Sequence, residues 1–142
     1  MSAPFLSPAE WQAVALSLRV ATVATLASLP LGLAVAWVLA RRRFPGHALL
    51  NGLVHLPLIL PPVVTGYLLL LTFGRRGAVG EWLDGFGIVF AFRWTGAALA
   101  AAVMAFPLMV RAIRLSLEAV DPRLEQAAGT LGASPVRVFL TV

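Results

Sequence analysis

The longest uncharged stretch of the chain is the feature that most limits what it can fold into. No charged side chain occurs between Arg19 and Arg41. A helix of about 20 apolar residues is long enough to cross the roughly 30 Å hydrocarbon core of a bilayer. The run 20–40 therefore predicts a transmembrane helix.

Two further runs have the same character. The second lies between Arg43 and Arg75, and the third begins after Arg93 and continues past Arg111 if the arginine extends to the interface. With 60% hydrophobic and 12% charged residues, a soluble domain of this size could not hide the apolar surface. We predict an all-α integral membrane protein that forms one domain over 1–142, with helices over about 12–40, 49–73 and 94–115, an external loop over 74–93, and a cytoplasmic coupling segment over 116–142.

Prolines interrupt the second run most strongly. Pro57, Pro61 and Pro62 remove backbone donors, so a straight lipid-facing helix is disfavoured there. A broken helix that lines a translocation path is one interpretation, and a kink packed against a neighbouring helix is the other. Pro30 and Pro107 raise the same alternatives for the first and third helices.

The distribution of arginine predicts the orientation. All 11 basic residues are arginines, and cytoplasmic loops carry more of them than external ones. If the segments after the first and third helices are on the inside, that side carries the larger share of the arginines. This orientation places the N-terminus outside and the residue-142 side in the cytoplasm. Because apolar spans separate the arginines, nucleic-acid binding is disfavoured. The inner group is Arg41, Arg42, Arg43, Arg111, Arg114, Arg123 and Arg137, and the outer group is Arg19, Arg75, Arg76 and Arg93.

The tail after the third span predicts a short amphipathic helix. Asp121 and Pro122 are typical of a helix start, and Gly132 is placed to end the helix. Ser134 and Pro135 then begin another helix, which we expect to continue through Phe139. The apolar face can dock into a groove of a soluble partner or pack on its own protein. This face consists of Leu124, Ala127, Ala128 and Leu131.

Catalytic and metal-binding patterns are missing from the sequence. With no lysine the chain lacks a phosphate-binding Gly-Lys loop. His47 and His55 have no ligand partners at metal-binding spacing, so we interpret both as interfacial or packing residues. The acids of the tail, Glu118, Asp121 and Glu125, are expected to be solvated. We predict no enzyme activity, no cofactor and no metal.

Polar groups inside the spans do not identify a substrate site. Helix contacts explain them as well as substrate contacts do; they are Thr25, Ser28, Thr65 and Tyr67. In the external loop, glycines and aromatic side chains are typical of an ordinary interfacial loop, which we favour over a substrate contact. The aromatic residues are Trp82, Phe86, Phe90, Phe92 and Trp94.

The tail resembles the cytoplasmic loop of permease subunits from prokaryotic ABC importers. Their pattern is Glu-Ala-Ala, three residues, Gly, nine residues, Ile-x-Leu-Pro, and Gln126-Ala127-Ala128 with Gly132 has the same spacing. Gln126 stands in the Glu position, and Glu125 is one residue earlier. The Ile position falls on Val142, the last residue.

Within that family the chain is most similar to the molybdate permeases. The resemblance runs nearly from end to end of the chain and covers what would be the N-terminal portion of such a permease. The stretches that carry this resemblance are 10–14, 44–46, 55–70, 74–77 and 106–115. The closest alternative is a sulfate or thiosulfate permease. An alternative of another class is a truncated three-helix membrane protein that only binds a partner.

The resemblance implies a permease of the prokaryotic cytoplasmic (inner) membrane that imports molybdate, or its analogue tungstate. Its implied partners are membrane lipid, a separate ATP-binding cassette ATPase, a second copy of the permease, and a periplasmic or lipid-anchored oxyanion-binding protein. It also implies further membrane helices, so we expect the chain to be a fragment or a truncated product. The segment 122–131 would be the coupling helix that contacts the ATPase through Glu125, Gln126, Ala127, Ala128, Leu131, Gly132 and Ala133.

Overall fold

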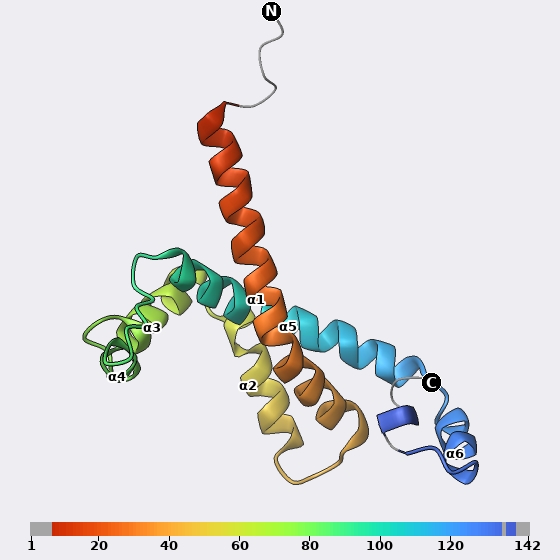
Figure 1. Ribbon diagram of the computed structural model, residues 1–142. Coiled ribbons are helices and arrows are strands. Elements are labelled where there is room, and N and C mark those ends of the chain that lie inside the picture. The colour runs from red at the N-terminus through yellow and green to blue at the C-terminus, as the bar shows by residue number, and fades with distance from the viewer. Residues whose placement is uncertain (1–6, 135, 139–142) are drawn as a thin grey trace, which may run out of the picture.

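The computed structural model describes residues 7–134 and 136–138, apart from the side chains of Pro122 and Glu125 (Figure 1). Within this part every regular element is a helix, so the all-α prediction is confirmed. Two helices are long and apolar enough to cross a membrane, and a bent pair provides a third candidate span. In chain order the helices are α1 (Pro8–Arg41), α2 (His47–Ile59), α3 (Pro62–Phe73), α4 (Ala78–Asp84), α5 (Trp94–Ala119) and α6 (Pro122–Thr130).

The start of α1 is set by a capping box. The Glu10 backbone N–H donates to the Ser7 side chain, and the Ser7 backbone N–H donates to the Glu10 carboxylate at 2.6 Å. Pro8 occupies the first helical position, where its missing N–H costs nothing. The helix therefore begins four residues before the predicted 12–40 segment, and its 34 residues make it about 51 Å long.

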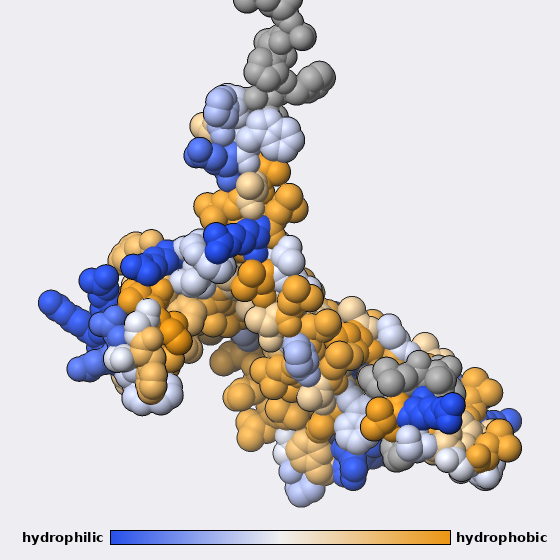
Figure 2. All heavy atoms as spheres, in the orientation of Figure 1, coloured by the Kyte–Doolittle hydropathy of each residue, from blue (hydrophilic) through white to orange (hydrophobic). Residues whose placement is uncertain are grey.

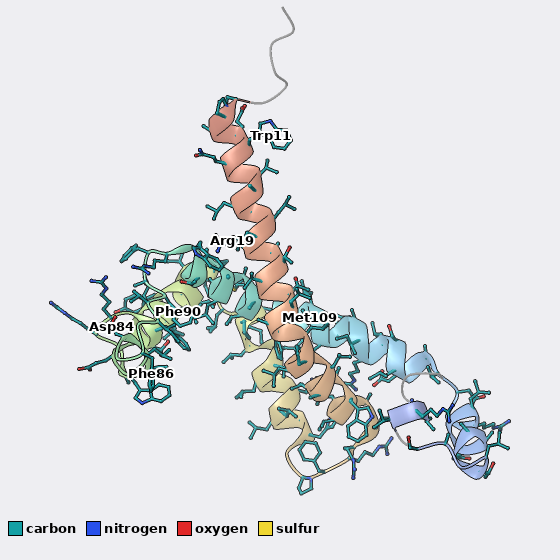
Figure 3. The ribbon with its side chains drawn as sticks, viewed as in Figure 1. Trp11, Arg19, Asp84, Phe86, Phe90 and Met109 are labelled. Atoms are coloured by element: carbon teal, nitrogen blue, oxygen red, sulfur yellow. The ribbon has the colours of Figure 1, made fainter. Side chains whose placement is uncertain are left out.

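Helices α1 and α5 pack against each other and run in the same direction. Near their N-terminal contact, the Arg19 guanidinium lies 4.0 Å from the centre of a Trp94 ring. Further along, the Ser28 hydroxyl lies 3.9 Å from the Met109 sulfur, where the two helices cross (Figure 3). A Cβ atom at Gly32 would be 3.0 Å from the same sulfur. Small residues on α1 thus allow the close approach by which membrane helices associate.

The core lies at the other end of this helix pair, where α2 joins it. Its buried residues are Ala36 and Leu39 of α1, Val54 of α2 and Val110 of α5. Ala36 and Val110 are completely buried. Val35, Leu50, Phe106 and Ile113 pack around this cluster. The first, second and third apolar runs of the sequence therefore meet in one core.

The second apolar run is broken between α2 and α3. A residue before proline avoids the helical region, and the two consecutive prolines impose this on Leu60 and on Pro61. Both have extended backbones, with ψ of 139° and 140°. The direction of the chain consequently bends by 109° between α2 and α3. The prolines of this segment had disfavoured a straight helix there. Pro30 and Pro107, by contrast, lie inside the uninterrupted helices α1 and α5.

The segment predicted as an external loop contains the short helix α4. Its tight packing on the end of α3 depends on glycine, because a Cβ at Gly80 would overlap the carbonyl oxygen of Gly74. Phe73 and Phe90 form an edge-to-face contact with ring centres 5.9 Å apart. This contact holds the returning chain beside α3 before α5 begins.

Candidate functional site

The short helix α6 begins where the sequence predicts. The Asp121 carboxylate accepts a hydrogen bond from the backbone N–H of Arg123 at 2.9 Å, which caps the first turn. Pro122 is the first helical residue. Only Val120 and Asp121 separate α6 from α5, and both are extended. The end of a candidate span is therefore joined to α6 by a very short connection.

The end of α6 is a glycine-dependent turn. Gly132 has a φ of +82°, a left-handed conformation that other residues rarely adopt. The Gly132 N–H donates to the Gly129 carbonyl at 3.0 Å, and the Ala133 N–H donates to the Ala128 carbonyl at 3.1 Å. This hydrogen-bond pair is the Schellman arrangement. Leu131, predicted as the last helical residue, is the cap just after Thr130.

The apolar face of α6 is open to solvent. Leu124 is 57% exposed and Leu131 is 88% exposed. Ala127 is also exposed, whereas Ala128 is half-buried. Leu124 on the helix and Leu131 at its cap are therefore two large apolar side chains that the described residues leave largely uncovered.

The remaining predicted contact residues fall on the same helix and its final turn. Gln126 and Gly132 are exposed, and Ala133 is half-buried. The side chain of Glu125 lies outside the described part of the chain. In the segment that follows, the Ser134 hydroxyl accepts a hydrogen bond from the Arg137 N–H at 3.3 Å. The positions that the sequence analysis used beyond this point, Pro135, Phe139 and Val142, also lie outside the described residues.

A polar cluster lies at the end of α5 that precedes α6. The Arg114 guanidinium donates to the Glu118 carboxylate at 2.7 Å and to the Asn51 side-chain oxygen of α2 at 3.4 Å. His55 Nδ1 lies 2.8 Å from the backbone oxygen of Asn51. These contacts connect α2 to the segment of α5 that carries α6. Sequence analysis missed this cluster, although the four-residue spacing of Arg114 and Glu118 was a usable signal.

Other polar groups considered in the sequence are involved in local hydrogen bonds. The Ser28 and Thr65 hydroxyls each donate to a backbone carbonyl four residues earlier. His47 Nε2 lies 3.0 Å from the carbonyl oxygen of Leu39, at the start of α2. Thr25 and Tyr67 have exposed side chains. The Ser28 and Thr65 contacts stay within their own helices, whereas the His47 contact joins the start of α2 to α1. None of these contacts singles out a substrate site.

Comparison with known families gives an extended match. Residues 28–142 match the family described as "Binding-protein-dependent transport system inner membrane component". The matched region includes the C-terminal part of α1, from residue 28 on, and all of α2 to α6. The bent pair and the exposed helix α6 are therefore both inside it.

Several individual proteins are similar to the chain. It is 65% identical over 138 residues to the molybdenum transport system permease protein ModB of Escherichia coli K12, covering 96% of the chain and 60% of that protein. The corresponding protein of Haemophilus influenzae is 59% identical, with 94% and 58% covered. The sulfate transport system permease protein CysT of Escherichia coli K12 is 43% identical over 78% of the chain and 40% of its own length. The chain thus spans about 60% of the length of these two molybdenum permeases.

Proposed function

The chain belongs to the family of binding-protein-dependent transport system inner membrane components, and on this premise we propose that it is the permease subunit of an ATP-driven ABC importer. It is an inner-membrane protein that crosses the bilayer more than once. The proposed cargo is molybdate, with tungstate as its chemical analogue. A separate ATPase chain would hydrolyse the ATP.

The exposed apolar face of α6 is the observation that carries this proposal. Burying a leucine side chain stabilises an association by roughly 1.5–3 kcal/mol, and Leu124 and Leu131 are both available for burial. Ala127 is small enough to let a partner approach the helix backbone closely. We propose that α6 is the coupling helix and that it docks into a groove of the ATPase. The proposed contact residues are Glu125, Gln126, Ala127, Ala128, Leu131, Gly132 and Ala133.

The link between α6 and the bundle supports mechanical coupling. Two extended residues separate it from α5, and Arg114 of α5 is connected to Asn51 of α2. A displacement of α6 by the ATPase would therefore reach α5 and α2 directly. The bent pair α2–α3 would then act as a third, broken span beside the translocation path, because its 109° bend leaves backbone groups that need polar partners.

The arrangement of arginine supports a cytoplasmic location for α6. Arg41, Arg42, Arg43 and Arg114 line one cavity at the end of the α1–α5 pair where α6 is attached. Arg19 lies on Trp94 at the other end. Positively charged residues accumulate on the cytoplasmic side. We propose that the N-terminus is outside and that α6 is inside.

The partners follow from the same proposal. A pore of this kind needs a second permease subunit, which we propose to be another copy of the chain. A periplasmic or lipid-anchored oxyanion-binding protein would deliver the cargo to the outer side. Similarity to molybdenum permeases at 65% and 59% identity, against 43% for a sulfate permease, favours molybdate.

The coupling role is tested by Gly132→Val in the full-length permease. A branched side chain strongly disfavours the left-handed backbone, at a cost of about 1–2 kcal/mol, so the last turn of α6 should be disrupted. We expect molybdate uptake to fall at least about tenfold and the ATPase to stop co-purifying with the permease. Gly129→Ala is the matched control, because Gly129 is helical and no atom lies within 4 Å of its added Cβ. Unchanged uptake in Gly132→Val would overturn the coupling role.

The cargo is tested separately by competition. Uptake of labelled molybdate by the complete importer should persist in a large excess of sulfate and should be lost in an excess of tungstate. Strong inhibition by sulfate would instead favour the sulfate permeases, to which the chain is also similar.

A further inference from the structure

Three arginines line one hollow on the segment that connects α3 to α5. Arg75 and Arg76 come from the turn between α3 and α4, and Arg93 immediately precedes α5. The hollow has a volume of about 710 Å³. Within the part of the chain that the structure describes, none of these three guanidinium groups has a carboxylate partner. Three positive charges therefore share a site without a compensating acid.

The backbone of the turn explains why two of these arginines are held there. A Cβ at Gly77 would overlap the carbonyl oxygens of Leu71 and Thr72, and one at Gly80 would overlap that of Gly74. Only glycine permits this close contact of α4 with the end of α3. The turn that carries Arg75 and Arg76 is therefore closely packed against α3.

Arg93, the third arginine, is positioned by a different set of contacts. Phe90 packs edge-to-face on Phe73 of α3, and the Thr95 hydroxyl donates to the Val89 carbonyl at 3.0 Å. These contacts fix the chain on both sides of Arg93. Between them, Phe92 has a φ of +56° and a side chain that is 98% exposed. Phe92 lines the hollow together with Arg93.

The chemistry of the hollow fits an anion with several terminal oxygens. A guanidinium group presents N–H donors in a planar fork that matches two oxygens of a tetrahedral oxyanion. The rest of the lining is largely apolar, with Leu70, Leu71 and Phe92 among its members, and it contains no acid. Glu81 and Asp84 belong to α4 but do not line the hollow.

We infer that the hollow lined by Arg75, Arg76 and Arg93 binds a tetrahedral oxyanion. The shared chemistry admits two sources, a free dianion such as molybdate and the phosphate of a lipid headgroup. The first source rests on the proposed import function, whereas the second requires only the membrane.

The test uses the permease–ATPase complex in lipid nanodiscs, prepared without the binding protein. Nanodiscs of phosphatidylcholine alone are titrated with labelled molybdate at low salt. A second set contains phosphatidylglycerol, and the lipid that stays bound to the protein is counted by native mass spectrometry. The double variant R75Q/R76Q is compared with R75K/R76K, which keeps the charge but loses the fork, and with Arg43→Gln, a matched control from the opposite end of the bundle.

Saturable molybdate binding that weakens at least about tenfold in R75Q/R76Q, less in R75K/R76K and not in Arg43→Gln would support a free oxyanion as the occupant. If molybdate does not bind, and if retention of phosphatidylglycerol decreases most in R75Q/R76Q, less in R75K/R76K and not in Arg43→Gln, the lipid headgroup is supported as the occupant. Equal binding of both probes by all proteins, or binding by none, overturns the site. If R75Q/R76Q fails to assemble, Arg93→Gln replaces it with the same criteria.

The outcome is independent of the coupling experiment. R75Q/R76Q is expected to keep its ATPase, because α6 lies at the other end of α5 from Arg93. Gly132→Val is expected to lose the ATPase and to keep oxyanion binding. A failure of the arginine site therefore leaves the proposed import function standing, and the reverse also holds.

Discussion

Apolar side chains are buried in one region of the molecule and exposed in another. The first region is the packed end of α1, α2 and α5, and the second is the short helix α6. Ala36 and Val110 are completely buried where the three helices meet. Leu124 of α6 and Leu131, the cap of that helix, are 57% and 88% exposed. Figure 2 shows a largely apolar surface over the bundle, whereas the end of the molecule that carries α6 combines apolar and hydrophilic patches.

This difference in burial follows from the expected surroundings of each region, which are the bilayer for the helix bundle and water for α6. Inside a bilayer, lipid is as apolar as a leucine side chain, so helices associate through close packing and small residues. In water, an apolar stripe is itself a driving force for association. The buried cluster of the bundle is formed by residues of α1, α2 and α5, whereas no described residue covers Leu124 of α6 to the same extent. Substitutions should affect folding in the first region and partner binding in the second.

The largest effect on folding is expected from Ala36→Leu. Ala36 has no exposed surface and packs in the cluster that contains Val54 and Val110, so the extra atoms must displace a neighbouring helix. We expect the free energy of unfolding in mixed micelles to fall by about 3 kcal/mol. Ala34→Leu on the exposed side of the same helix should change it by less than about 0.5 kcal/mol. Equal effects of the two changes would contradict the assigned core.

Removing volume from the same cluster should cost less. Val110→Ala leaves a cavity against Ala36 and Leu39, with an expected loss of about 2 kcal/mol in the free energy of unfolding. Leu108, on the same helix, is 58% exposed, so Leu108→Ala should have little effect. A denaturant titration that ranked Leu108→Ala above Val110→Ala would show that the buried face of α5 is assigned incorrectly.

A smaller, local effect is expected at the start of α6. Asp121→Ala removes the side chain that accepts from the Arg123 N–H, and loss of such a cap costs about 1 kcal/mol. Amide hydrogen exchange in α6 should become about fivefold faster, with no change in α5. Asp121→Asn keeps an acceptor oxygen and should exchange almost as slowly as the wild type. Uniformly faster exchange over α5 and α6 would mean that the two helices unfold together.

The sequence was sufficient for features that depend on neighbouring residues. The apolar runs predicted the helices that contain the candidate spans, the pair Pro61–Pro62 predicted the break, and Gly132 predicted the end of α6. In each case the cause lies within a few residues of its effect. The early start of α1 has an equally local cause, since Ser7 and Glu10 form a capping box, and it could have been predicted.

Features that depend on distant residues could not be predicted in the same way. Asn51 and Arg114 are 63 positions apart, and no periodicity brings them together. The stacking of Arg19 on Trp94 and the gathering of Arg75 and Arg76 with Arg93 likewise require the packed helices. The sequence analysis used these outer arginines only as counts for orientation. Their shared site became apparent from tertiary structure alone.

The smallest effect on folding, and the most informative about partner binding, is expected from Leu124→Ala. Because Leu124 is 57% exposed, its truncation should change the free energy of unfolding by less than about 0.5 kcal/mol. A central apolar contact residue nevertheless contributes more than about 1 kcal/mol to binding, so capture of the ATPase by the permease should weaken about tenfold. Leu115→Ala, with a similarly exposed side chain on α5, should leave capture unchanged. If both variants captured the ATPase as well as the wild type, the apolar face of α6 would not be the docking surface, and its exposure would need another explanation.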